Sequence, residues 1–216
     1  IFESPEFWSR RALKAKMRSP LELVAASVRS LGAQVDEPWQ LARAVSQTGQ
    51  LGVVSGTALD VVIARRLQNG DVGGDVRRAL NHFPVPAMAH RVLHRYFREG
   101  GKTPGQPYAP VPKLSLRPSA ACLELSAVAY FAEVWLAKEG HDGLVGINFL
   151  EKVQMATPSA AYGAMLAGVD YVLMGAGIPN EIPQLLDRLA NHEPARLSLD
   201  VDDATTEYTV GLDPDD

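Results

Sequence analysis

The sequence predicts an α/β fold with a parallel sheet, and two repeated patterns are the basis for this prediction. In one of them, an apolar strand at 144–150 is followed by a polar loop, a helix over 158–168, and a second apolar strand with a glycine turn at 171–177. In the other, a short strand at 51–54 precedes a helix over 57–70. Short apolar runs are typical of strands buried in parallel sheets, and strand–helix–strand units build such sheets with right-handed crossovers.

Three helices are expected before the first of these strands. Ser19 and Glu22 have the spacing of a capping box, in which each residue satisfies a backbone N–H group of the other. This box marks the start of an amphipathic helix, and a shorter helix precedes it. Asp36 is in the position to cap a third helix that runs to Gly49. In the same way, Thr57 is expected to cap the helix that follows the strand at 51–54.

The middle of the chain predicts further helices and one long loop. Two helices are expected within 71–100, and the prolines and glycines of 100–112 indicate an irregular loop. A brief strand is expected at 114–116. A long helix then runs from Ser119 to Gly140, with apolar residues at helical spacing.

The last part of the chain changes character. A helix is expected over 179–191, after the glycine turn. Apolar and polar residues then alternate in 197–201 and again in 208–212, with a polar turn between them. Alternation of this kind predicts a β-hairpin that buries one face.

Composition limits the class of protein. The chain has 216 residues and is 46% hydrophobic, which is enough for one large or two small globular domains. Its net charge of −4 argues against a general nucleic-acid binder. No run approaches the roughly 20 apolar residues of a membrane span. The single cysteine, Cys122, is expected to be a buried thiol in a cytoplasmic protein. The chain starts at Ile1 without an initiator methionine, which favours a fragment or a processed product.

The histidines do not predict a metal site or a catalytic base. His90 and His94 are four residues apart, but the sequence shows no third ligand at a matching spacing, so a surface or packing role is expected. His141 and Asp142 are neighbours at the amino end of the strand at 144–150. We expect them to form the turn into that strand rather than a catalytic pair.

Polar residues and glycines at the carboxyl ends of the predicted strands form the candidate binding site. Asn148 has an amide donor and acceptor, which suit the edge of a flat heterocycle such as a flavin ring. Lys152 adds a positive charge and Gln154 a second amide. Gly175 and Gly177 let backbone N–H groups approach a phosphate closely. The alternative is that Asn148 satisfies neighbouring backbone and that the glycines only turn the chain.

Three long phrases of the sequence resemble the nitronate monooxygenase family, also called 2-nitropropane dioxygenase-like. They are LARAVSQTGQLGVVSGTALDVVIARRL, EVWLAKEGHDGLVGINFLEKVQ and YGAMLAGVDYVLMGAGIPNEIPQLLDRLA, and the resemblance covers about residues 39–212. It implies a (β/α) barrel that binds FMN and oxidises alkyl nitronates with O2 to a carbonyl compound and nitrite. It also implies that Asn148 contacts the flavin, with Lys152, Gln154 and Gly175 near the cofactor by position.

Two parts of the family pattern are missing from this chain. A first strand that ends in a Pro-Met-Gly type of turn is absent, and so is the later Gly-Gly-His segment that holds the catalytic histidine. The resemblance therefore implies a partial TIM-type barrel, the N-terminal half only, over 39–216. The catalytic residue is unknown, since His141 does not match that segment. We expect a chain of this kind to be a poor catalyst.

The N-terminal segment resembles a different group of proteins. Residues 1–35 are similar to the C-terminal part of an uncharacterised helical bacterial family, so 1–38 is predicted to be a helical segment foreign to the rest. One hypothesis is that the chain joins two unrelated gene segments within 36–50. Two other functions stay open: an FMN-dependent enoyl reductase, and a non-enzymatic helical or interaction module.

Overall fold

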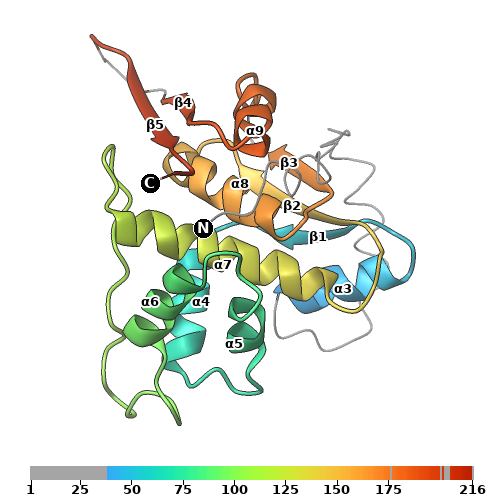
Figure 1. Cartoon of the computed structure of the whole chain (residues 1–216), viewed down its shortest axis with the longest axis vertical. Coiled ribbons are helices and arrows are strands. Elements are labelled where there is room, and N and C mark those ends of the chain that lie inside the picture. Colours follow the sequence, from blue (N-terminus) through green and yellow to red (C-terminus); the bar gives the residue numbers. More distant parts are fainter. Residues whose placement is uncertain (1–37, 176, 200, 202–204, 216) are drawn as a thin grey trace.

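The computed structural model describes residues 38–175, 177–199, 201 and 205–215, which form a mixed α/β fold (Figure 1). The fold class predicted from the sequence is therefore confirmed at this level. The expected helices of residues 1–35 and the expected cap at Asp36 lie outside the described residues. The capping box of Ser19 and Glu22 also lies there.

Three parallel strands form the sheet in the order β1–β2–β3: β1 (Gly52–Ser55), β2 (Val145–Leu150) and β3 (Tyr171–Gly175). In the register, Ser55 lies beside Asn148 and Asn148 lies beside Leu173. These strands match the three that the apolar runs predict, because a run buried on both sides is a strong local signal. In the described residues, β1 and β3 are the two edges of this sheet.

Helices α3 (Pro38–Gln47) and α7 (Ala120–Lys138) pack on one face of the sheet, where Val54 and Ile147 are fully buried. Close approach of α3 requires a glycine in β1. A Cβ atom built on Gly52 would lie 1.8 Å from the carbonyl oxygen of Ala42. Because side chains of a strand alternate between faces, Ser55 and Asn148 belong to the opposite face.

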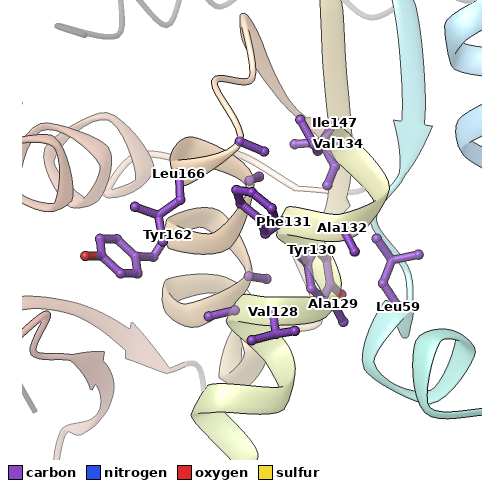
Figure 2. Packing of buried hydrophobic residues seen from close by; sticks show 14 of the residues in the cluster. Leu59, Val128, Ala129, Tyr130, Phe131, Ala132, Val134, Ile147, Tyr162 and Leu166 are labelled. Atoms are coloured by element: carbon purple, nitrogen blue, oxygen red, sulfur yellow. The ribbon is translucent and has the colours of Figure 1, made fainter. Parts of the chain in front are cut away.

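The long helix α7 is the centre of the fold (Figure 1). The helices α4 (Leu59–Gln68), α5 (Asp75–Leu80) and α6 (Pro86–Tyr96) pack on one side of it, and α8 (Thr157–Leu166) packs on the other. Figure 2 shows Phe131 of α7 beside α8, and Leu59 of α4 across α7 from it. A helix covered on several sides needs apolar residues around most of its circumference.

Our expectation from the sequence did not include α7 as a candidate membrane span, and the burial of this helix explains why it is so apolar. By length and composition alone, α7 is apolar enough to cross a membrane, but 72% of its apolar window is buried inside the fold. A core helix of a globular protein has the same properties. The apolarity of α7 is therefore accounted for by packing against its neighbours.

Helix α9 (Ile182–Ala190) and a two-stranded antiparallel sheet complete the described chain. The sheet consists of β4 (Ala195–Leu199) and β5 (Tyr208–Leu212), with Leu197 paired to Val210 and both buried. The predicted hairpin is therefore confirmed. A short 3-10 helix, η2 (Gln154–Ala156), leads into α8.

Two local predictions are wrong. Thr57 does not cap α4: the residue before the helix is Ala58, in a left-handed conformation with φ 53°, and it makes no capping bond through its side chain. The predicted strand at 114–116 is absent, and this segment is irregular. The preceding loop is held instead by the buried amide of Gln68, which accepts from the Ala109 N–H (2.6 Å) and donates to its carbonyl (3.3 Å).

A buried ion pair joins α4 to α7. Glu133 of α7 is fully buried and accepts a hydrogen bond from Arg66 of α4, whose side chain is 15% exposed. Burial raises the pKa of Glu133 to about 7, and the positive charge of Arg66 opposes this shift only in part. The fold therefore holds a carboxyl group that binds its proton more tightly than an exposed glutamate does.

This shift makes the stability of the fold depend on pH. Between pH 4.5 and 7 the unfolded chain ionises Glu133 while the folded chain keeps its proton, so the free energy of unfolding falls as the pH rises. The loss amounts to roughly 3 kcal/mol across that window. Urea unfolding at several pH values measures it. Glu133→Gln is expected to remove most of the slope, and an unchanged slope in that variant would contradict the assignment.

Candidate functional site

The carboxyl end of the parallel sheet carries the residues that the sequence singles out first. Asn148 is half-buried near the end of β2, between Ser55 of β1 and Leu173 of β3. Ligands in parallel α/β folds bind at this end of the strands. Asn148 is therefore in the position that the sequence predicts for it.

The side chain of Asn148 is directed along the sheet toward β3. A Cβ atom built on Gly175 would have the amide oxygen of Asn148 as its nearest neighbour, at 3.8 Å. Two of the predicted site residues, Asn148 and Gly175, are thus brought together on one face. The absent side chain at Gly175 leaves room beside the amide.

The amide of Asn148 makes no hydrogen bond to another side chain or backbone group among the described residues. Its polar atoms are not among the buried side-chain atoms without a partner, so they reach solvent and can exchange water for a ligand. This observation argues against the alternative in which Asn148 satisfies neighbouring backbone. It leaves a donor and an acceptor available to a ligand.

Neighbouring residues fix the backbone of Asn148. The N–H of Gly56 donates to the carbonyl of Asn148 at 2.8 Å, and a Cβ atom at Gly56 would lie 2.8 Å from that same oxygen. The hydroxyl of Tyr130 in α7 donates to the carbonyl of Gly56 at 2.9 Å. Burial raises the pKa of Tyr130, so its phenol stays protonated and keeps this bond. The end of β1 is therefore anchored both to the core and to β2.

A polar hollow of about 180 Å³ lies next to this edge, at the carboxyl ends of β2 and β3. Its lining residues come from the loops after these strands, from the starts of α8 and α9, and from β4. They are Glu151, Gln154, Thr157, Met174, Ile178, Pro179, Asn180, Glu181, Ile182, Leu197 and Ser198. Gln154 is the one predicted site residue in this lining.

The charge of the hollow is negative. Glu151 accepts a hydrogen bond from the Gln154 side chain at 3.2 Å, and Glu181 accepts one from the backbone N–H of Ser198 at 2.8 Å. The described lining contains no lysine or arginine to balance the two carboxylates. The hollow is therefore unfavourable for an anion such as a phosphate.

The remaining two predicted site residues lie elsewhere. Lys152 is exposed in the loop after β2 and does not line the polar hollow. Gly177 is exposed, and the carboxylate of Glu151 lies against it, since a Cβ atom at Gly177 would be 2.1 Å from that carboxylate. The structure thus pairs Asn148 with Gly175, and places Gln154, Lys152 and Gly177 outside this pair.

These placements test how well the residues fit FMN. The ring edge fits, because Asn148 offers an unpaired donor and acceptor beside the open position of Gly175. The phosphate does not fit at the turn formed by Gly175 and Gly177, because the Glu151 carboxylate occupies the approach to Gly177. Two negative charges in contact there would repel each other.

Sequence reasoning missed Glu151, Glu181 and Ser198. Glu151 follows β2 directly, so the same strand-end argument that selects Asn148 would have selected it. Glu181 and Ser198 meet because the hairpin folds back onto the start of α9. That contact is long-range, and no local pattern signals it.

The histidines and the cysteine are placed as expected. His90 and His94 are exposed on α6. His141 makes a hydrogen bond from its ring to the carbonyl of Ala137 (2.7 Å) and accepts one from the Gly143 N–H (3.1 Å), so it forms the turn into β2. Cys122 is buried. Among the described residues, no group of three or more histidine, cysteine, aspartate and glutamate side chains is close enough to hold a metal ion.

Comparison with known proteins adds no relative. No protein-family model, no curated protein and no solved structure matches the chain.

Proposed function

We propose that this chain is an FMN-dependent oxidoreductase of the nitronate monooxygenase type, built on part of a (β/α) barrel and working in the cytoplasm. The observation that carries the proposal is the unpaired, half-buried amide of Asn148 at the carboxyl end of a parallel strand. The resemblance of three long phrases to that family supports the same assignment. Bound FMN would supply the redox chemistry between an alkyl nitronate and O2.

The role of Asn148 is to bind and orient the ring. Its amide offers one donor and one acceptor, which match the alternating polar atoms along the edge of an isoalloxazine. Gly175 keeps the adjacent position open for the flat ring. The bonds of Gly56 to Asn148 and to Tyr130 hold the backbone of this strand end in place before a ligand arrives.

The electrostatics disfavour the polar hollow as the place for the substrate. A nitronate is an anion, and the carboxylates of Glu151 and Glu181 disfavour it in the polar hollow. The cofactor phosphate is excluded from the approach to Gly177 for the same reason. Both anions would therefore lie outside the hollow.

A flavin titration of the purified chain, followed by FMN fluorescence, tests the proposal. FMN is expected to bind, and Asn148→Ala is expected to weaken binding by about 3- to 10-fold, the effect of losing one or two hydrogen bonds. Asn180→Ala is the matched control, because it removes the same amide from the lining of the polar hollow.

Two results would contradict the proposal. Unchanged FMN fluorescence with the wild-type chain would remove the flavin assignment. A larger loss of FMN affinity in Asn180→Ala than in Asn148→Ala would show that FMN binds in the polar hollow and not beside Asn148. Nitrite formed from propyl nitronate and O2, above the level with FMN alone, is the matching activity readout. Because this chain is expected to be a poor catalyst, FMN binding without such nitrite would leave the flavin site standing. Reduction of an enoyl thioester by the FMN-loaded chain, without nitrite from the nitronate, would overturn the nitronate assignment.

A further inference from the structure

A second hollow differs from the polar hollow, because its surface is mostly apolar. It has a volume of about 80 Å³ and lies between α6, α7, α8 and the end of β5. Its lining residues are Phe83, Val85, Met88, Ala120, Leu123, Glu124, Ala127, Tyr162, Leu166, Leu212, Asp213 and Pro214. Side chains of α7 and α8 form the floor.

One side of this apolar hollow is closed by residues 212–215, which we call the strap. Leu212, Asp213 and Pro214 line the hollow, and Pro214 is buried. The N–H of Asp215 donates to the side chain of Asp213 at 3.1 Å, which turns the strap back on itself. The strap follows β5 and, among the described residues, pairs with no strand beyond Leu212.

A chain of polar contacts holds the end of the strap. The Nε2 atom of His192 lies 3.3 Å from Oδ1 of Asp215, and the Nδ1 atom of His192 lies 3.3 Å from the hydroxyl of Tyr162. Burial raises the pKa of Tyr162 to about 12, so its phenol is neutral. His192 has a left-handed backbone with φ 58°, a conformation that non-glycine residues seldom adopt. This conformation ends α9, because the N–H groups of His192 and Glu193 donate to the carbonyls of Leu189 (3.1 Å) and Arg188 (2.9 Å).

We propose that the strap is a hinged cover of the apolar hollow, latched by the ion pair of His192 and Asp215. Release of the latch exposes an apolar groove between α6, α7 and α8. The latch joins three elements: the residue after α9, α8 through Tyr162, and the strap. This device is separate from the Asn148 site and does not depend on the function proposed above.

Charged groups of both signs lie around the latch. Arg188 and Glu193 lie on the side of α9, 3.9 Å apart, and Arg188 also donates to the carbonyl of Pro194. Glu124 of α7 lines the hollow and pairs with Arg91 at 2.7 Å. Asp213 and Asp215 are the acidic groups of the strap. Removal of either member of the contact between His192 and Asp215 is therefore expected to favour the open strap.

The expected effect is modest, because the side chain of Asp215 is 77% exposed. Exposed ion pairs stabilise a contact only weakly. We therefore expect loss of this pair to change the population of the open strap by about two- to fivefold. The variants are Asp215→Asn, which keeps the shape and removes the charge, and His192→Asn, since asparagine tolerates the left-handed backbone. Glu193→Gln is the control, because it removes an acidic charge next to His192 without touching the strap.

Hydrogen exchange of the peptide covering 208–215 and Nile red fluorescence measure the opening of the strap and the exposure of the groove. At pH 6, Asp215→Asn and His192→Asn are expected to exchange this peptide about two- to fivefold faster than the wild type and to bind more Nile red. Glu193→Gln is expected to exchange this peptide at the rate of the wild type, because its carboxylate does not touch the strap. Equal rates in all four proteins, or faster exchange over the whole chain in Asp215→Asn, would overturn the proposal.

Discussion

Arg66→Ala is expected to destabilise the fold by about 3–5 kcal/mol at pH 8. The arginine is the partner of Glu133, which is fully buried in α7. Without Arg66 the carboxylate has no charge to compensate it, and an uncompensated buried charge costs far more than an intact pair contributes. The cost is expected to be smaller at pH 5, where the folded chain keeps Glu133 protonated.

Urea unfolding at pH 8 and pH 5 measures this loss. The matched control is Arg65→Ala, which removes the same side chain from an exposed position one residue earlier. Arg65 lies over the ring of Tyr108 at 5.3 Å, so its removal is expected to cost about 1 kcal/mol or less. Equal losses of stability in Arg66→Ala and Arg65→Ala would show that Arg66 does not compensate the buried charge of Glu133.

Gly163→Ala is expected to destabilise the chain by about 3 kcal/mol or more. Helix propensity alone favours alanine over glycine by about 1 kcal/mol in a helix. A fall in the free energy of unfolding would therefore have to come from packing and not from helix propensity. The reason for the loss is close packing of α8 on α7. A Cβ atom at Gly163 would lie 2.1 Å from the carbonyl oxygen of Ala127, and a helix backbone has little freedom to move away.

Gly175→Ala is the control for this substitution, because its Cβ atom would meet its nearest neighbour at the ordinary contact distance of 3.8 Å. Its cost is expected to stay below about 1 kcal/mol. The thermal midpoint and the urea midpoint of both variants measure the difference. A Gly163→Ala protein as stable as the wild type would contradict the packing of α7 and α8.

The strands were predictable because their signals are local. The apolar runs that end at Val54, Leu150 and Met174 are buried on a parallel sheet, and the alternation around Leu197 and Val210 places both on the buried face of the hairpin. Local signals failed where the tertiary structure decides. The sequence before α4 offers Thr57 as a cap, but the chain uses a left-handed turn there instead.

The candidate site was predictable in part. Asn148 and Gly175 come together because the carboxyl ends of neighbouring parallel strands meet at one edge, which the strand pattern alone implies. The glycine turn was a poorer guide, since the Glu151 side chain that covers Gly177 comes from another strand end. Gln154 lines a different hollow, because the hairpin and α9 pack there. Such long-range packing has no signature in a single sequence.

The central proposal is that Asn148, at the edge of the parallel sheet, contacts the ring of a flavin. It also holds that the phosphate does not bind at the turn of Gly175 and Gly177. Riboflavin separates the two parts of the ligand, because it carries the ring without the phosphate. A phosphate bound in the anion site that the glycines suggest would make FMN bind far more tightly than riboflavin.

The most direct measurement is therefore a riboflavin titration of the wild-type chain and of Asn148→Ala, compared with FMN by fluorescence. We expect riboflavin to bind the wild type within about threefold of FMN, and Asn148→Ala to lose about 3- to 10-fold in affinity for both ligands. Riboflavin that does not bind, or that binds both proteins equally, would contradict the contact between Asn148 and the flavin ring.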